Sequence, residues 1–136
     1  MLKKVKINTL LVSVTDNGED RITSQSDGVC KVEETGLVLH YAEKDNHGTA
    51  QLLISSDIAD LNRKGLTRSR MTFIEGRMLP CPYTTPQGDL DLSLFTHSFS
   101  SSVNALGGRF QARYTMMAAG RQVADNVLTV EFTFTD

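Results

Sequence analysis

Four arginines and two tyrosines on separate segments could together bind an anionic or polar group. They are Arg68, Arg70, Tyr83, Arg109, Arg113 and Tyr114. A guanidinium group binds a carboxylate or phosphate through two parallel hydrogen bonds, and a tyrosine hydroxyl can donate or accept one more. These residues form a candidate ligand-binding site, on condition that the fold brings their faces together.

Whether the arginines meet depends on which side of each extended segment faces the interior. In both segments the arginines share one face and apolar residues share the other: Arg68 and Arg70 against Met71 and Phe73, and Arg109 and Arg113 against Phe110 and Tyr114. If the apolar faces fill the interior, the arginines point to water and acidic neighbours. If the polar faces turn inward, they form a cationic patch. The outward arrangement is the favoured prediction.

The remaining reactive side chains lack the spacing of a metal or catalytic site. The histidines and cysteines lie far apart in the sequence: Cys30, His40, His47, Cys81 and His97. A structural zinc site usually has ligands at short, regular spacings, and a hydrolase serine often lies in a Gly-x-Ser-x-Gly turn, which this chain lacks. We therefore expect no metal, no cofactor and no catalytic residue, and an enzyme is the less favoured interpretation.

Length and charge narrow the class of protein. The 136 residues fit one domain, residues 1–136. The formal net charge is −2 and no basic run occurs, so we expect no nucleic-acid partner. No apolar stretch approaches the roughly 20 residues that cross a bilayer, so we expect no membrane partner. The chain has only two cysteines, and they lie far apart in the sequence, so we expect both to be reduced thiols. Because thiols stay reduced in the cytoplasm, this predicts a cytoplasmic location.

Apolar and polar residues alternate along most of the chain, which is typical of strands with one buried face. The clearest runs hold apolar residues at even positions: Phe110, Ala112, Tyr114, Met116 and Ala118, then Leu128, Val130, Phe132 and Phe134. Ala119-Gly120 between these runs predicts a hairpin. Further turn signals, such as Asn17-Gly18 and Thr85–Gly88, divide the chain into about eight to ten strand-length segments.

Two segments depart from this pattern. In the first, Val5 and Ile7 are odd whereas Leu10 and Val12 are even, which predicts a β-bulge. In the second, Ser56–Lys64, the spacing is compatible with one or two helical turns. Many short strands joined by tight turns form a meander, and closure removes the edges of such a sheet. The predicted fold is therefore a single antiparallel all-β barrel.

Several stretches resemble the YwiB-like family of small bacterial proteins: Arg68–Phe73, Glu75-Gly76, Tyr83–Leu90, Gly107–Arg109 with the strand of Tyr114, and Val123–Phe134. The resemblance covers most of the chain in layout, and its specific pieces are Arg68–Phe73 and Tyr83–Gly88. It implies a calycin-like (lipocalin-like) barrel, related to ligand-carrying families. It implies no established activity, substrate or catalytic residue.

Two functions fit such a barrel. The first is binding of a small apolar or amphipathic ligand in or at the mouth of the barrel, because Ser24, Ser26 and Gly28 share a face and would leave room inside. The alternative is a protein-interaction or assembly module, such as a homodimer, with a filled barrel and no ligand. Its features would be apolar residues that oppose the main apolar face of their strands: Leu53, Ile74, Phe95 and Phe99.

Overall fold

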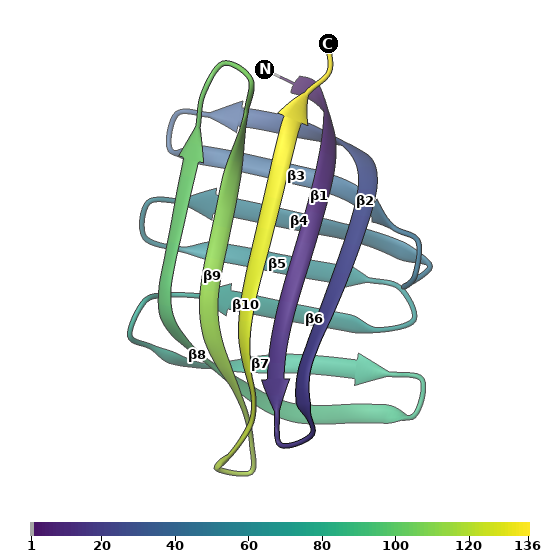
Figure 1. Cartoon of the computed structure of the whole chain (residues 1–136), viewed down its shortest axis with the longest axis vertical. Coiled ribbons are helices and arrows are strands. Elements are labelled where there is room, and N and C mark those ends of the chain that lie inside the picture. Colours follow the sequence, from purple (N-terminus) through teal and green to yellow (C-terminus); the bar gives the residue numbers. More distant parts are fainter. Residues whose placement is uncertain (1) are drawn as a thin grey trace.

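A computed structural model describes residues 2–136, which form ten strands joined by short turns (Figure 1). The strands are β1 (Leu2–Thr15), β2 (Gly18–Glu33), β3 (Gly36–Glu43), β4 (Gly48–Ser55), β5 (Ala59–Lys64), β6 (Arg68–Phe73), β7 (Met78–Thr85), β8 (Gly88–Val103), β9 (Gly107–Ala118) and β10 (Arg121–Phe134). Sequence neighbours pair antiparallel, and β1 also pairs with β10, which closes the sheet. The predicted all-β antiparallel meander barrel is confirmed.

The barrel is flattened into two layers whose strands cross. In Figure 1, β8, β9, β10, β1 and the first part of β2 run lengthwise, in front of β3–β7, which run crosswise. The two strands of 16 residues, β2 and β8, pass from one layer to the other. β2 pairs with β1 through Gly18–Lys31 but with β3 only through Gly28–Glu33. The layers are therefore joined along the end of β2 and separate along its beginning.

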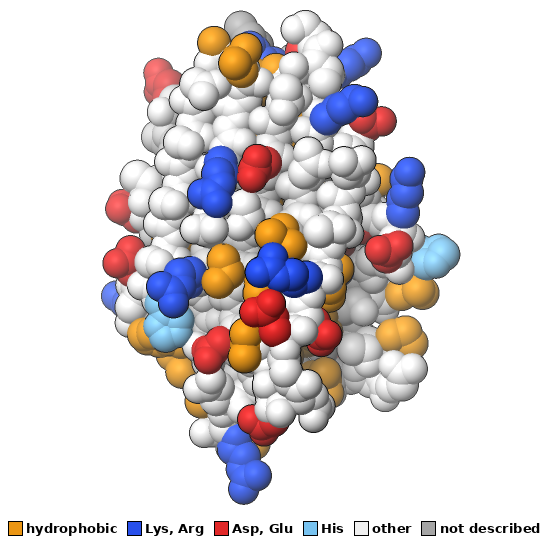
Figure 2. Space-filling model, in the orientation of Figure 1, with side chains coloured by type: hydrophobic (Ala, Val, Ile, Leu, Met, Phe, Trp, Pro, Cys, Tyr) orange, Lys and Arg blue, Asp and Glu red, His pale blue; other side chains and the backbone are white. Residues whose placement is uncertain are grey.

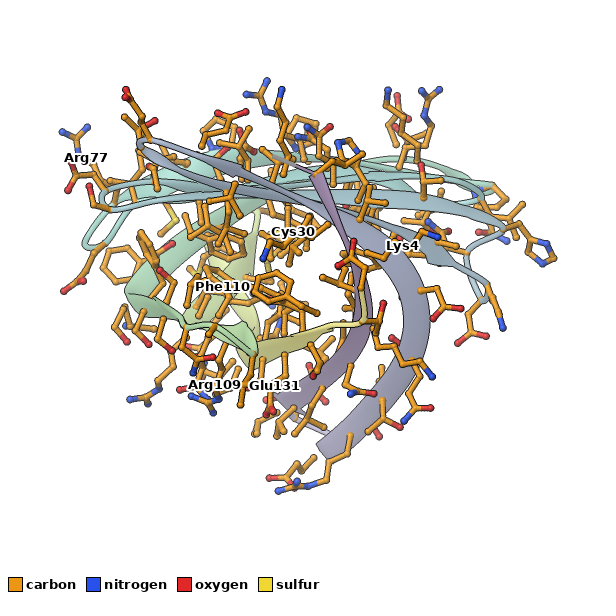
Figure 3. The ribbon with its side chains drawn as sticks, turned by 90° about the horizontal axis from the view of Figure 1, so that it is seen from above. Lys4, Cys30, Arg77, Arg109, Phe110 and Glu131 are labelled. Carbon is orange, nitrogen blue, oxygen red and sulfur yellow. The ribbon has the colours of Figure 1, made fainter. Side chains whose placement is uncertain are left out.

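Apolar side chains from every strand fill most of the interior. Three aromatic rings lie at its centre, with the ring centroid of Phe73 6.0 Å from that of Phe110 and 5.2 Å from that of Tyr114. Figure 3, seen from above, shows Phe110 pointing inward and Arg109 and Glu131 pointing away from the barrel. Because the apolar faces occupy the interior, the polar faces of the strands point to solvent.

The predicted bulge in the first strand is wrong. β1 keeps one unbroken register with both β2 and β10. Val5 and Ile7 are each 1% exposed inside the barrel, whereas Leu10 and Val12 are half-buried on its outer face. There they line a shallow outer hollow together with Val127. The change of parity therefore marks a second, outer apolar surface rather than an extra residue.

A bulge occurs instead in β8, where the register with β9 shifts between Thr96 and Ser98. The extra residue, His97, moves every later side chain of β8 to the opposite face. The prediction that Phe99 opposes the main apolar face is wrong for this reason. Phe99 packs against the core, with its ring centroid 6.0 Å from that of Phe110.

The segment predicted to form one or two helical turns contains a strand instead. Within Ser56–Lys64, residues Ala59–Lys64 form β5, which pairs with β4 and β6. Ala59 and Leu61 alternate into the core. The helical interpretation is wrong because pairing on both sides outweighs local spacing. Among the described residues, no helix has the length and apolar character needed to cross a membrane.

Gly28 does not leave the free space inside the barrel that the sequence predicts. A Cβ atom at this position would lie 2.3 Å from the backbone oxygen of His40 and 2.9 Å from Cδ1 of Ile7. It would also lie 3.0 Å from Cβ of Tyr41. The missing side chain therefore lets β3 and the core approach β2 closely, and the expectation of room for a ligand is wrong at this residue.

We expect Gly28→Ala to lower the free energy of unfolding by about 2 kcal/mol or more, because the added methyl group meets backbone that cannot move alone. Urea unfolding followed by circular dichroism measures the loss. Gly76→Ala is the matched control: Gly76 has a φ of +78°, but no atom lies within 4 Å of its Cβ position, so it reports backbone strain of about 1 kcal/mol. A smaller loss at Gly28 than at Gly76 contradicts the packing argument.

Candidate functional site

A cavity of about 560 Å³ lies where β2 separates from β3. The edge of β2 lines one side of it through Ile22–Gln25, and the turn after β3 lines another through Lys44–Asn46. Because Gly18–Asp27 pair with β1 but not with β3, the cavity reaches the surface beside this strand. It is the part of the interior that the core does not fill.

Apolar and tyrosine side chains line the inner part of the cavity. They are Leu11, Tyr41, Leu61, Met71, Tyr83, Tyr114 and Leu128. Tyr41 and Tyr114 are buried, and Tyr83 is half-buried. The inner part of the cavity is therefore largely apolar, with phenol hydroxyls among its polar groups, whereas β2 and the turn after β3 add polar and charged side chains at its edge.

An ion pair between Arg63 and Glu43 lies at the same cavity. Nε of Arg63 donates to both carboxylate oxygens of Glu43 at 3.1 Å. Arg63 is on β5 and Glu43 on β3, so the pair reaches across β4, where Ala50 stands opposite Arg63 and Gly48 opposite Glu43. The side chains are 27% and 20% exposed. Small residues on β4 thus make room for a largely buried pair.

The surroundings keep the guanidinium of Arg63 charged. Burial by itself lowers the pKa of Arg63, but the charge and hydrogen bonds of Glu43, followed by Tyr83, outweigh burial and raise the pKa above its usual value. The bonds to Glu43 go through Nε, and the guanidinium carries four further N–H groups on its terminal nitrogens. Arg63 can therefore hold Glu43 and still present donors to a bound polar group.

Asn46 fixes the turn that carries Glu43. Its Oδ1 accepts from the backbone nitrogen of Thr67 at 2.7 Å, and its Nδ2 donates to the backbone oxygen of Thr67 at 2.8 Å. The same Nδ2 donates to Oε1 of Glu43 at 3.4 Å. The turns after β3 and β5 are tied together in this way, so the carboxylate is held in place before any ligand arrives.

The buried tyrosines stay neutral at physiological pH. Burial, followed by the nearby Glu43 carboxylate, raises the pKa of Tyr41, and the charge of Arg63 opposes this only in part. Burial also raises the pKa of Tyr114 to about 12. Neutral phenols donate as well as accept hydrogen bonds, so these groups suit a ligand with a polar, hydrogen-bonding part.

The structure divides the six predicted binding residues between two faces. Tyr83 and Tyr114 line the cavity, whereas the arginines are exposed on the outer face: Arg68, Arg70, Arg109 and Arg113. Two of the arginines meet acidic neighbours there, in the pairs Arg70–Asp60 at 3.0 Å and Arg109–Glu131 at 3.8 Å. Figure 2 shows basic and acidic side chains interspersed over the face that it draws. The arginines are not brought together with the tyrosines.

Sequence reasoning missed Arg63, Glu43 and Tyr41 as members of one site. The alternation of residues did indicate Arg63, because Arg63 stands two residues after Leu61 and four after Ala59, on the same inward face of the strand. The helical interpretation of that segment concealed it. Glu43 continues the face of Tyr41 in the same manner, but its meeting with Arg63 follows from the register of three strands.

A hydrogen-bonded chain on the outer face joins His97, Thr115 and Asp125. Oγ1 of Thr115 donates to Oδ1 of Asp125 at 2.6 Å and lies 2.7 Å from Nε2 of His97. Because the Thr115 proton goes to the carboxylate, Nε2 of His97 is the donor in this contact. His97 is exposed and does not line either described cavity. Among residues 2–136, no three metal-ligating side chains cluster.

The two cysteines are free thiols inside the barrel. Burial raises the pKa of Cys81 to about 11, and burial also raises the pKa of Cys30, against a smaller opposing effect of Lys3. The thiolate, not the thiol, is the nucleophile of cysteine chemistry. Both side chains therefore act as small packing groups at neutral pH.

Comparison with known proteins gives the chain a family. Residues 5–130 match the family described as a domain of unknown function, DUF1934. The chain belongs to the DUF1934 family. No curated protein matches this DUF1934 chain.

The crystal structure of the ywiB protein from Bacillus subtilis is similar to this DUF1934 protein. The two structures match with a TM-score of 0.88, the match covers 99% of this chain and 94% of that one, and 18% of the residues are identical. At this identity the likeness shows the barrel fold. The resemblance to YwiB-like proteins noted from the sequence is thereby confirmed.

We expect the free energy of unfolding to fall by on the order of 5 kcal/mol as the pH rises from about 9 to about 12. Burial raises the pKa of Cys81 from 9.0 to about 11 and that of Tyr114 from 10.0 to about 12. At a pH between the unfolded-state and folded-state pKa of each group, the unfolded chain has released a proton that the folded chain retains, so a rise in pH favours unfolding. Below about pH 9 both groups are protonated in both states, and their contribution to the stability of the folded chain is fully present. Urea titrations across this pH range measure the slope, and Cys81→Ala should flatten it. An unchanged slope contradicts the assignment.

Breaking the ion pair on one side should cost about 2 kcal/mol of unfolding free energy, because Arg63→Met leaves the carboxylate of Glu43 largely buried without its partner. Glu43→Leu should cost about as much, because it leaves the guanidinium of Arg63 without its partner. The double variant Arg63→Met/Glu43→Leu replaces both charges with apolar groups and should recover most of the loss. A double-mutant cycle in urea tests this, and additive losses would show that the two groups are uncoupled.

Proposed function

We propose that this DUF1934 protein is a non-enzymatic barrel that binds a small amphipathic molecule in the cavity beside β2. The observation that carries the proposal is the ion pair Arg63–Glu43, held in place at a cavity of about 560 Å³ whose inner part is lined by apolar and tyrosine side chains. Ligand pockets of proteins are typically about 300–1,000 Å³, mostly apolar, with a few fixed polar groups that orient the ligand. The cavity matches this description in size and in lining.

The lining divides into two parts that would receive the two ends of such a ligand. Leu11, Leu61, Met71 and Leu128 would contact its apolar part. Its polar part would meet the terminal nitrogens of Arg63 and the hydroxyl of Tyr83, near the turn that carries Glu43. Because the ion pair is neutral as a whole, a ligand with an uncharged polar group suits it without displacing Glu43.

Native mass spectrometry of freshly purified protein, together with thermal shifts across a panel of fatty alcohols, monoglycerides and metabolites, tests the proposal. We expect either a co-purified mass or an increase of at least about 5 °C in melting temperature at 100-fold excess over the dissociation constant. The bare chain mass combined with no shift across the panel overturns the proposal.

A pair of leucine-to-tryptophan variants separates the cavity from other surfaces. Leu11→Trp fills the cavity with a larger side chain and should abolish the shift or the co-purified mass. Leu53→Trp makes the same chemical change on the outer face, where Leu53 is 41% exposed, and should leave binding unchanged. If both variants bind equally, the ligand occupies another place.

A further inference from the structure

β2 has a free edge along its first part. It pairs with β1 through Gly18–Lys31, but pairing with β3 begins only at Gly28. Over Gly18–Asp27 one side of the strand therefore lacks a partner strand among the described residues. An unpaired edge presents backbone N–H and C=O groups that can pair with another strand.

The middle of this edge lacks the features that usually prevent pairing. Ile22–Ser26 contains no charge, no proline and no bulge, although these are the common protections of an edge strand. Ile22 is 54% exposed, despite a position on the inward face of β2. Charged residues stand at both ends of the stretch, Arg21 before it and Asp27 after it. Because Arg21 and Asp27 have opposite charges, two antiparallel copies of this edge can be checked for a register that places each of these residues opposite the other.

Two copies of one strand can pair antiparallel about a two-fold axis perpendicular to the sheet. Residues on the same face then stand opposite each other, so the axis passes midway between the two copies of one residue, which stand opposite each other. With Ser24 on the axis, Arg21 stands opposite the partner's Asp27, and Asp27 opposite the partner's Arg21. Ile22 then stands opposite the partner's Ser26, which covers the exposed apolar side chain. Opposite charges facing across two strands stabilise the pair.

Other registers lack this pairing of opposite charges. With Thr23 at the axis, Glu19 stands opposite the partner's Asp27, and with Arg21 at the axis the two guanidinium groups face each other; like charges directly opposite destabilise a strand pair. With Ile22 or Gln25 at the axis, no two charged residues of Gly18–Asp27 stand opposite each other. The register centred on Ser24 is therefore the one in which opposite charges stabilise the pair.

We propose that two copies of this chain associate through β2, edge to edge and antiparallel, with Ser24 at the two-fold axis. The occupant of the free edge is a second copy because, in this register, Arg21 of each copy stands opposite Asp27 of the other, so the edge is complementary in charge to a second copy of itself. In one copy Arg21 already lies 3.2 Å from Glu19, and Lys6 stands opposite Asp27 on β1. These are exposed contacts that cost little to rearrange. The dimer requires no ligand in the cavity, so either proposal can fail without the other.

Charge reversal with rescue tests the dimer. Sedimentation velocity and light scattering of the wild type should give twice the 15.0 kDa chain mass at high concentration. Arg21→Asp and Asp27→Arg each place two pairs of like charges across the axis, so each should weaken dimerisation by about tenfold or more. The double variant Arg21→Asp/Asp27→Arg restores opposite charges and should restore the dimer. Both side chains are exposed, so circular dichroism should show an unchanged fold.

A cysteine pair gives a readout that does not depend on affinity. Ser24→Cys places a thiol opposite itself and should form a disulfide-linked dimer on mild oxidation. Ser26→Cys, on the same face, stands opposite the partner's Ile22 and should not. The native cysteines, Cys30 and Cys81, are buried and do not interfere.

Three outcomes overturn the proposal. The first is a strict monomer at all concentrations, which leaves the edge unpaired or open to another protein. The second is a dimer that neither single charge reversal weakens, or that the double reversal fails to restore. The third is equal cross-linking of the Ser24→Cys and Ser26→Cys variants.

Discussion

The pairing of β1 with β10 is the constraint on which the rest of the structure depends. It joins the first strand to the last along an unbroken register, so the meander has an inside and an outside. Alternation then assigns every side chain to one of them. Phe73, Phe110 and Tyr114 meet in the interior, and the arginines on the intervening positions are directed to solvent. Without closure, both faces of the sheet would be available to water, and the same alternation would not separate a core from a surface.

Closure is incomplete along β2, and the candidate site exists for that reason. The strand pairs with β1 from Gly18 but with β3 only from Gly28, which leaves a cavity between the edge of its first part and the turns of the other layer. A polar group in this position is largely shielded from solvent yet reachable. Arg63 and Glu43 satisfy each other across β4, which removes the cost of a lone buried charge. The same gap supplies both the proposed ligand site and the free strand edge.

Burial keeps the thiols and the buried phenols of the interior neutral. Burial keeps the thiols of Cys30 and Cys81 and the hydroxyl of Tyr114 protonated at neutral pH, so none of them is an activated nucleophile. Arg63 and Glu43 in the cavity are engaged with each other. His97 is hydrogen-bonded to Thr115, but its side chain is exposed and does not line the cavity. Membership of the DUF1934 family and the likeness to the ywiB protein establish the family and the barrel fold.

The sequence by itself determined the features that depend on neighbours along the chain. Alternation defined the strands of Phe110 and Val130 and the hairpin at Ala119-Gly120, and it placed Tyr114 inside, because these follow from the two-residue period of an extended backbone. Only the tertiary structure decided what depends on pairing between distant segments. The bulge at His97 turns Phe99 inward, and β5 is a strand because two neighbours pair with it. Arg63 meets Glu43 because the registers of three strands align them, and local spacing carries no record of register between strands.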